Sequence, residues 1–463
     1  MRFLPRYISR LLSLGILVFG LPVALYLLST RTNFFGRAAG EKASLVIDYF
    51  SANPRDNIAW RNFAQGGEEQ NSMISAVIPQ VKKLQPEKIR IDHIYDYYGV
   101  VSRDVSGGLV FDWKRLDDAV DDILSTGAKP FLSLSYMPSA ISSGKETDIP
   151  RNWRDWQLLV KATVEHYSGK NNKAIDGVYY EVWNEPDLFG NFKMFGNKAY
   201  FDLYYYSALG AQSALNTLDF KIGGPATTAL YENWFIPLIN KIKLAGLRYD
   251  FYSWHRYSKD ILDFEKDAAM SQMLLTEGGF TNIERIISEY GHSSAIDPGY
   301  DITFGAIHTL AVAAVLDGRI DRAFGFELKD GPGASKYWGR WGIITHEKYG
   351  EVEVKPRYKA YEFLNFMQGE HLFVSGQGSW VKSFASKDDS KVKILIVNYD
   401  EQAKHVETVP ISILNLQNGS YILIRRDFLG GTKQRIVDVA DNTLKIVEFF
   451  PANSASVIEL SPQ

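Results

Sequence analysis

The 463-residue sequence predicts an α/β fold, a (β/α)8 TIM barrel with a C-terminal antiparallel β-sandwich and an N-terminal transmembrane helix. Three observations support this prediction. Leu11–Thr30 contains no charged residue. From about residue 57, β-rich runs alternate with amphipathic helical patterns, which is typical of βαβ units. After about residue 366, short alternating strands are separated by Asn, Asp and Gly turns, which is typical of a small sandwich.

The uncharged amino-terminal segment is long enough to span a bilayer, because twenty helical residues cover roughly 30 Å. Arg2, Arg6 and Arg10 precede it. The positive-inside rule therefore keeps the short amino terminus in the cytoplasm and sends the rest across the membrane. A cleaved signal peptide is the alternative, although no clean A-x-A site lies near Ser29. We expect a single-pass inner-membrane protein whose main domain is periplasmic or extracellular.

Eight β-rich runs are expected to form the barrel. Between them, apolar residues recur at three- and four-residue intervals over 73–84, 116–127 and 153–167, which predicts helices. Pro79 marks a kink or a helix start, and Gly127 suits a helix end. A doubly wound open sheet is the alternative, but no early strand leads into G-x-G-x-x-G. The expected strands cover residues 59–67, 88–93, 129–136, 177–184, 221–226, 249–257, 284–291 and 322–330.

These patterns divide the chain into four segments. Residue range 1–30 is the cytoplasmic stub and anchor, and 31–56 is a linker. Ala43–Phe50 within that linker is a candidate extra strand of the sandwich. The barrel is expected over 57–365 and the sandwich over 366–463.

Composition excludes several classes of function. The net charge of −3 gives no electrostatic basis for binding nucleic acid. The absence of cysteine excludes disulfides, thiolate metal sites and cysteine nucleophiles. No H-E-x-x-H, G-x-S-x-G or phosphate-binding glycine loop is present, so we predict no metal and no cofactor. Aromatic residues make up 14% of the chain, which suits either a core or a sugar-binding cleft.

Two glutamates stand at predicted strand ends. Glu185 follows the fourth strand in YYEVWNEPDLFG (179–190), and Glu289 ends the seventh in ISEYG. A plain strand-to-loop exit is the alternative for the first motif, because Asn, Pro and Asp favour turns. In a closed barrel, strands four and seven face each other across the mouth, where catalytic residues gather. A carboxylate pair there suits glycoside hydrolysis, in which one group protonates the leaving oxygen and the other attacks the sugar or activates water.

These residues resemble a known group of enzymes. WNEP (183–186) and SEYG (288–291) are similar to the Asn-Glu and Glu motifs of clan A of the glycoside hydrolases. The closer likeness is to glycoside hydrolase family 39, which includes xylosidases and exopolysaccharide-associated hydrolases. Phe111–Pro138 and Asp250–Ser258 resemble further stretches of that family, so the likeness extends over roughly the whole predicted barrel.

The resemblance implies a role for each matched residue in a retaining mechanism. Two carboxyl groups about 5–5.5 Å apart are expected, because retention leaves no room for water between them. The implied roles are general acid/base for Glu185, nucleophile for Glu289, a hydrogen bond to the sugar 2-hydroxyl for Asn184, support of the ionised nucleophile for Tyr257 and Arg90, and lining of the same wall for His255.

Further substrate-binding candidates rest on position alone. His93 and Asp96 follow the second strand, where an ordinary loop hydrogen-bond network is the alternative. Tyr136 and Trp183 are expected to line the cleft, with core packing as the alternative for Trp183. The remaining candidates are Trp338 and Trp341 as stacking platforms after the eighth strand and Glu327, expected within that strand, as a sugar contact.

The sequence therefore predicts a membrane-anchored retaining glycosidase that cleaves a polysaccharide, in particular a bacterial exopolysaccharide. The predicted partners are that glycan, the membrane and the machinery that exports the polysaccharide. One alternative is a non-catalytic polysaccharide-binding or assembly protein on the same fold. A transglycosylase is the other alternative, because it would share the covalent intermediate and differ only in excluding water.

Overall fold

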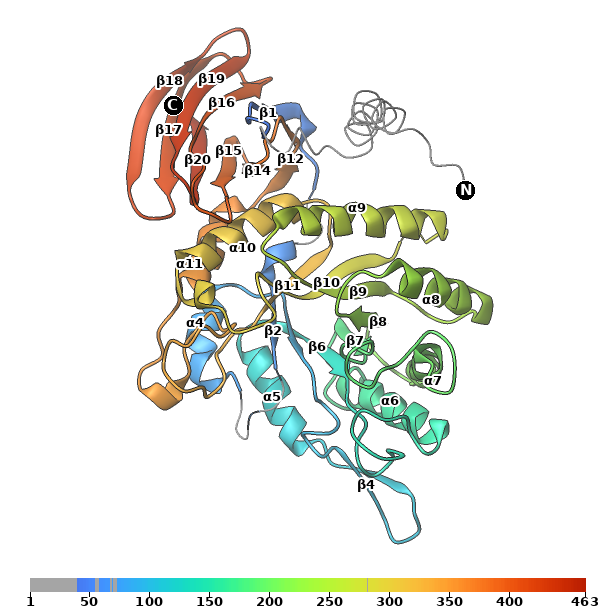
Figure 1. The fold of residues 1–463 in the computed structure, drawn as a ribbon. Helices are drawn as coiled ribbons and strands as arrows, with labels where there is room; N and C mark the ends of the chain where they lie inside the picture. The colour runs from blue at the N-terminus through green and yellow to red at the C-terminus, as the bar shows by residue number, and fades with distance from the viewer. Residues whose placement is uncertain (1–39, 55–57, 67–68, 70–72, 281) are drawn as a thin grey trace, which may run out of the picture.

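The computed structural model describes residues 40–54, 58–66, 69, 73–280 and 282–463. The predicted transmembrane segment, Leu11–Thr30, lies outside these residues. Within the described ranges, none of the helices has both the length and the apolar character that a bilayer span requires. Figure 1 shows a barrel surrounded by helices, with a β-sandwich on one side.

Eight parallel strands close into a barrel, as the sequence predicts. Strand β11 pairs with β2, which joins the last strand of the barrel to the first. Each strand lies within or near its expected run. Glu327 is an exception to the prediction, because the eighth strand ends one residue before it. The strands are β2 (Asn62–Gln65), β3 (Lys88–Ile91), β6 (Lys129–Leu134), β7 (Val178–Val182), β8 (Phe220–Thr227), β9 (Phe251–Tyr257), β10 (Glu284–Gly291) and β11 (Arg322–Phe326).

The helices lie outside the barrel strands. The helix expected over 73–84 begins later than predicted, because its first turn, Ser75–Val77, is 3-10 and Pro79 occupies the first α-helical turn. Proline fits there, since the first turn leaves backbone N–H groups without partners anyway. Gly127 follows the second helix with φ 93°, as its role at a helix end requires. The helices are α4 (Ile78–Lys83), α5 (Lys114–Ser125), α6 (Trp153–Tyr167), α7 (Tyr200–Gln212), α8 (Glu232–Ala245), α9 (Ile261–Glu277), α10 (Thr303–Leu316) and α11 (Pro356–Leu364).

Aromatic side chains fill part of the barrel interior, around Phe131 of β6. Phe131 packs against Phe324 and Phe251, with ring centroids 4.7 and 5.4 Å away. Tyr179 of β7 stacks on the same ring. Because side chains alternate along a strand, Glu181 takes the next inward position of β7. The layer of aromatic rings around Phe131 therefore lies next to a layer of the barrel interior that contains the charged side chain of Glu181.

The sandwich consists of two sheets. Strand β1 is the predicted extra strand, and it pairs in parallel with β16. The sandwich is therefore mixed and not purely antiparallel as expected. One sheet contains β13 (Val374–Ser375), β1 (Leu45–Asp48), β16 (Glu407–Leu414) and β19 (Thr443–Phe450). The other contains β12 (Glu370–Leu372), β14 (Val381–Asp388), β15 (Lys391–Asn398), β20 (Ser454–Pro462), β17 (Gly419–Asp427) and β18 (Thr432–Val439). A separate hairpin, β4 (Val101–Arg103) and β5 (Leu109–Phe111), projects on the side of the barrel away from the sandwich (Figure 1).

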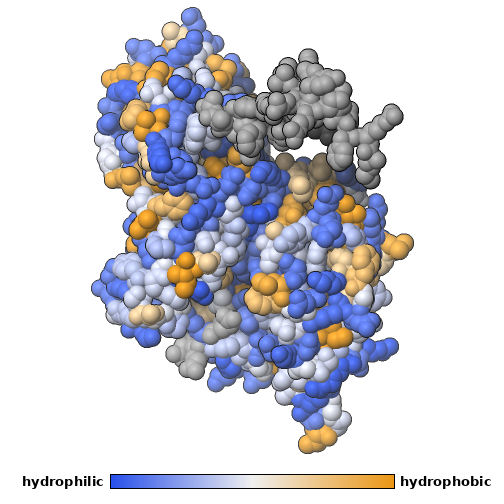
Figure 2. Space-filling model, in the orientation of Figure 1, coloured by the Kyte–Doolittle hydropathy of each residue, from blue (hydrophilic) through white to orange (hydrophobic). Residues whose placement is uncertain are grey.

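The sandwich packs on the barrel through an apolar contact. Phe384 of β14 and Leu395 of β15 belong to the same buried cluster as the barrel helices. The rings of Phe384 and Trp60 lie 5.0 Å apart, and the Tyr399 hydroxyl donates to the carbonyl oxygen of Lys259 at 2.7 Å. On the face shown in Figure 2, apolar residues occur in small groups among hydrophilic ones.

We expect Phe384→Ala to lower the free energy of unfolding by about 3–5 kcal/mol, because it opens a cavity between the two domains. Phe384 is 2% exposed. Urea denaturation followed by circular dichroism measures the change. Phe449→Ala is the control, since that ring is 53% exposed on the same sandwich. Equal unfolding midpoints for the two variants would contradict the packing role of Phe384.

Candidate active site

The end of β7 shows why the strand stops at the WNEP motif. Trp183 and Glu185 have φ values of 74° and 45°, in the left-handed region that non-glycine residues rarely adopt. The Glu185 backbone N–H donates to the carbonyl oxygen of Ala226 at 2.9 Å, and the Phe189 N–H donates back to Glu185 at 2.7 Å. These bonds hold a sharply turned backbone that directs the Glu185 side chain towards the barrel mouth.

Glu289 lies near the carboxyl end of β10, next to a break in the ladder. The pairing of β10 with β9 shifts register between Ile287 and Glu289. A β-bulge of this kind re-aims a side chain and is common beside functional sites. Glu289 is consequently buried, with 6% of the residue exposed, yet it lines the pocket.

One buried arginine connects the two motifs. Arg90 donates from Nη1 to Glu289 Oε1, from Nη2 to Asn184 Oδ1 and from Nε to Glu181 Oε2, each at 2.7 Å. The Tyr257 hydroxyl donates to the other Glu289 oxygen at 2.9 Å. Glu289 therefore has a partner on both carboxylate oxygens.

His255 lies between the two carboxylates. Its Nδ1 is 2.9 Å from Glu185 Oε1 and 3.5 Å from Glu289 Oε2. One oxygen of Glu185 and one of Glu289 lie within 4.8 Å of each other and of this imidazole nitrogen. The two carboxyl groups thus face one narrow space, from opposite parts of the barrel mouth.

Burial and charge shape the ionisation of this group. Burial raises the pKa of Glu289 above its ordinary value, and Glu185 adds to that effect, whereas His255 and Arg90 oppose it. Burial lowers the pKa of His255, but the Glu289 and Glu185 carboxylates outweigh burial and raise it. The imidazolium form is therefore favoured while both carboxylates are charged.

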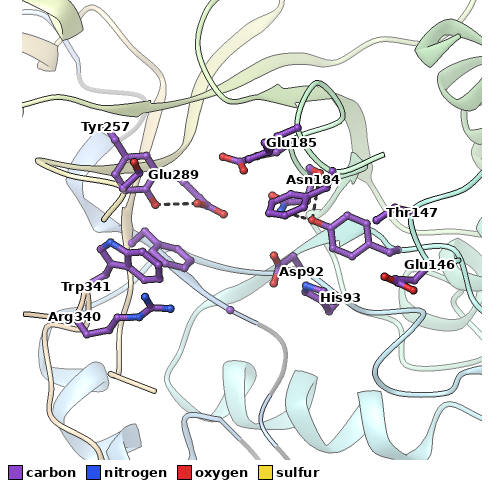
Figure 3. A pocket seen from close by; sticks show the side chains of 16 residues that line it. Asp92, His93, Glu146, Thr147, Asn184, Glu185, Tyr257, Glu289, Arg340 and Trp341 are labelled. Atoms are coloured by element: carbon purple, nitrogen blue, oxygen red, sulfur yellow. Dashed lines mark hydrogen bonds between the residues drawn. The ribbon is translucent and has the colours of Figure 1, made fainter. Parts of the chain in front are cut away.

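A pocket of about 580 Å³ opens above these residues. Figure 3 shows the carboxylates of Glu185 and Glu289 facing the same space, with Glu146 on one side of it and Arg340 with Trp341 on the other. The Arg340 guanidinium carbon lies 3.4 Å from the ring centroid of Trp341. The pocket combines opposed carboxylates with an aromatic wall, which suits a sugar ring between acid and nucleophile.

The family model of "Glycosyl hydrolases family 39" matches residues 67–304. The chain belongs to glycosyl hydrolase family 39. A β-xylosidase of Caldicellulosiruptor saccharolyticus is 25% identical over 372 residues, which are 72% of this chain and 73% of that protein. Family membership makes this chain a glycosidase, so the prediction of a glycosidase is confirmed.

Solved structures support the fold of this family 39 enzyme. A monomeric β-xylosidase from Caulobacter crescentus CB15 matches with a TM-score of 0.71 and 21% identity, covering 91% of this chain and 99% of that one. A family 39 enzyme from Xanthomonas axonopodis pv. citri also matches with a TM-score of 0.71 and 21% identity, over 91% of this chain and 98% of that one. The predicted barrel is confirmed on these grounds.

The pocket of the family 39 enzyme contains some of the predicted sugar-binding residues and not others. His93 and Tyr136 line it, together with Trp341. Asp96 lies behind them, where it bonds His93 Nδ1 at 2.8 Å and the Tyr136 backbone N–H at 3.0 Å. Asp96 therefore orients pocket residues without lining the pocket itself.

Three predicted substrate-binding residues do not line this pocket. Trp183 is fully buried and donates from its indole N–H to the carbonyl oxygen of Phe189 at 3.0 Å, so it packs in the core. Trp338 does not line the pocket, and the Arg340 guanidinium lies 5.3 Å from its ring centroid. Glu327 is buried and accepts from Gln65 Nε2 at 3.3 Å. Burial raises the pKa of Glu327 well above its ordinary value, with Asp330 adding to the shift.

Several lining residues have no motif that marks them in the sequence. Asp92 directly follows β3, so the strand-end argument that selected His93 would also have found it. Except for Phe326 at the end of β11, the other missed side chains come from loops, and their placement depends on barrel closure. They are Glu146 and Thr147 from the loop before α6, Leu188 and Phe189 after the WNEP motif, and Ser294, Phe326 and Arg340 on the opposite wall.

Two groups within the described residues have the side-chain types that bind a cation. Glu185, His255 and Glu289 form the first, and the hydrogen bond from His255 to Glu185 already links its members. Glu69, His346 and Glu347 form the second. The Lys329 ammonium donates to Glu69 at 2.9 Å and to Glu347 at 3.0 Å. A lysine cation thus balances the carboxylates of the second group.

Tyr257→Phe is expected to move the acid limb of kcat/KM to higher pH. The substitution removes the hydroxyl donor to Glu289, which favours the neutral carboxyl and raises its pKa. Activity at a pH below the optimum should fall roughly tenfold to a hundredfold, the value of one hydrogen bond to a charged group. A pH profile with an aryl glycoside measures both effects.

Tyr95→Phe is the matched control for this profile. Its hydroxyl pairs with Thr163 Oγ1 at 2.8 Å, in the core and away from the pocket. The control should keep the wild-type acid limb. A Tyr257→Phe profile that coincides with the wild-type curve would show that the hydroxyl does not stabilise charged Glu289.

Proposed function

We propose that this family 39 glycosidase acts with retention of anomeric configuration, using Glu289 as nucleophile and Glu185 as general acid/base. The proximity of the two carboxylates is the observation that carries this proposal. An oxygen of each lies within 4.8 Å of the other. Inverting enzymes need carboxyl groups about 6.5–9.5 Å apart to hold a water between them. The spacing supports direct attack by Glu289 on the sugar.

In the first step, a Glu289 oxygen forms a bond to the anomeric carbon while the bond to the leaving oxygen breaks. Glu185 gives its proton to that oxygen, so the leaving group departs as an alcohol. In the second step, Glu185 takes a proton from water, and the resulting hydroxide attacks the same carbon. The bond to Glu289 breaks, and its carboxylate is restored.

Asn184 is suited to hold the sugar during both steps. Its Oδ1 accepts from Arg90, and its Nδ2 donates to the Tyr136 hydroxyl at 2.8 Å. These two bonds fix the orientation of the amide. The second N–H of the amide then remains to donate to a sugar hydroxyl in the pocket, where Asn184 is a lining residue.

The proposed substrate is a polysaccharide, in particular a bacterial exopolysaccharide. Two similar proteins are named β-xylosidases, so a β-xyloside is the second candidate. The uncharged segment Leu11–Thr30 favours the exopolysaccharide, because an enzyme anchored there would meet a glycan as it is exported. Contact with the export machinery is part of this proposal.

Location is tested by finding where the enzyme resides in cells. We propose an inner-membrane protein with a periplasmic or extracellular barrel. Membrane fractions should contain the intact chain, and protease added to spheroplasts should degrade the barrel. A catalytic domain free in the medium, with its amino terminus near residue 30, would contradict the anchor.

The activity is tested with the protein from residue 40 onward, on aryl glycosides including β-xylosides and on bacterial exopolysaccharides. Released reducing ends identify the substrate, and the product lengths separate endo from exo cleavage. Proton NMR early in the reaction reports the anomer formed first, and retention is expected. Inversion would disprove the double-displacement proposal, and longer glycans without net release would indicate a transglycosylase. Tight binding without cleavage of any substrate would favour the polysaccharide-binding alternative.

A further inference from the structure

Glu181 is a buried charge that the proposed mechanism does not use. It lies on β7 and is fully buried, as is its partner Arg90. The Arg90 Nε donates to Glu181 Oε2 at 2.7 Å. Glu181 does not line the pocket, so it does not meet a substrate there. Among the described residues, the charged neighbour at bonding distance is Arg90, which also holds Glu289.

Arg90 shares one positive charge between two carboxylates. Its other two nitrogen atoms, Nη1 and Nη2, donate to Glu289 and to Asn184, again at 2.7 Å. A guanidinium has its donors in one rigid plane, so a bond at one edge fixes the direction of the other two. A cation between two buried anions also stabilises each of them less than it would stabilise one alone.

We propose that Glu181 is a positioning residue that acts through Arg90, fixing the guanidinium plane and limiting how strongly Arg90 stabilises the negative charge of Glu289. The inference rests on the proposed function, in which Glu289 is the nucleophile. A carboxylate that is held less tightly as an anion is the better nucleophile. The same bond keeps Arg90 Nη2 directed at Asn184, which orients the amide that faces the sugar.

The groups around Arg90 and Glu181 determine the direction in which the pKa of Glu289 should change when Glu181 loses its charge. Tyr200 and Tyr249 interact electrostatically with Glu181, but their hydroxyls donate to backbone carbonyls of Val182 and Gly224. Removing the Glu181 charge therefore leaves Arg90 to interact more strongly with Glu289, which lowers the Glu289 pKa. The titratable or charged groups that face Glu289 are Arg90 and Asp92 from the β3 side, Tyr136 after β6, Glu185 after β7, and His255 and Tyr257 on β9.

The test is the pH profile of kcat/KM for Glu181→Gln on the substrate that the wild type cleaves. The acid limb, which reports ionisation of Glu289 in the free enzyme, should move to lower pH by about one unit. Glu284→Gln is the matched control. Glu284 lies on the same strand as Glu289, where it bonds Tyr179 and Lys221, and its loss should leave the limb in place.

Glu181→Asp separates the charge from the geometry. It keeps the negative charge but shortens the side chain, so the acid limb should stay near its wild-type position. The kcat should fall about tenfold or more, because Arg90 loses its support. This variant also decides the question if Glu181→Gln does not fold, since a limb shifted by the Asp variant would overturn the proposal.

A folded Glu181→Gln with an unshifted acid limb would equally overturn the proposal. Circular dichroism and the urea unfolding midpoint establish that the variant is folded. The inference and the proposed function fail in different ways. A wild type that cleaves no glycoside would contradict the function, whereas an active wild type with identical profiles in all variants would contradict only the role of Glu181.

Discussion

Glu289→Gln is expected to lower kcat by at least about 10⁴-fold, because loss of a covalent nucleophile typically costs that much or more. The amide keeps the volume of the side chain and an oxygen that accepts from Arg90, so the pocket stays formed. The KM for an aryl glycoside should change far less than kcat. The loss is measured by comparing initial rates of the variant and the wild type at saturating substrate.

Chemical rescue makes this prediction specific to the nucleophile. In Glu289→Ala, azide can enter the space that the carboxylate leaves and attack the anomeric carbon from that face. The expected product is a glycosyl azide of inverted configuration, identified by NMR. Glu284→Gln again serves as the control and should keep its activity. A glycosyl azide of retained configuration would place the nucleophile elsewhere.

Glu185→Gln is expected to lower kcat about 10²–10⁴-fold on glycosides with poor leaving groups, the usual contribution of general acid–base catalysis. The effect should depend on the leaving group. A dinitrophenyl glycoside needs no protonation of its leaving oxygen, so its first step should remain fast. The second step lacks a base, and the glycosyl-enzyme should accumulate. Stopped-flow absorbance should therefore show a burst of phenolate followed by slow turnover.

The location of the trapped sugar provides the decisive control. Mass spectrometry of the burst-phase enzyme should find one sugar attached to the peptide that contains Glu289. Azide should accelerate turnover of this variant and give a product of retained configuration, because it replaces the water of the second step. A rate loss that is the same for dinitrophenyl and alkyl glycosides would contradict an acid/base role for Glu185.

The barrel strands were predictable because their signal is local. Each is a short run of β-branched and aromatic residues between turn residues, and the alternation of strands with helices implies a parallel sheet. The two glutamates could be placed by the same reasoning, since a barrel collects its strand ends at one mouth. Helix α4 starts later than the sequence predicts, because the apolar period continues through a 3-10 turn that precedes Pro79.

The rest of the site depends on information that a local pattern does not contain. Trp183 and Trp341 are both tryptophans next to barrel strands, yet one packs in the core and the other lines the pocket. Which way each ring points is decided by backbone turns that distant segments hold, such as the bond from Glu185 to Ala226. The sequence does not mark Glu181, because the role of a charged residue inside a β-run depends on its partner on another strand, here Arg90 of β3.

The parallel pairing of β1 with β16 makes the barrel an insertion within the sandwich. Ile47 lies beside Ile413, so one sheet joins the first described strand to strands that follow the barrel (Figure 1). During synthesis, β1 leaves the ribosome before the barrel, and its partners β13 and β16 follow only after the whole barrel. Contacts this distant in sequence form late, so the sandwich is expected to close after the barrel has folded. The sandwich therefore cannot be obtained as an autonomous module by cutting the chain once.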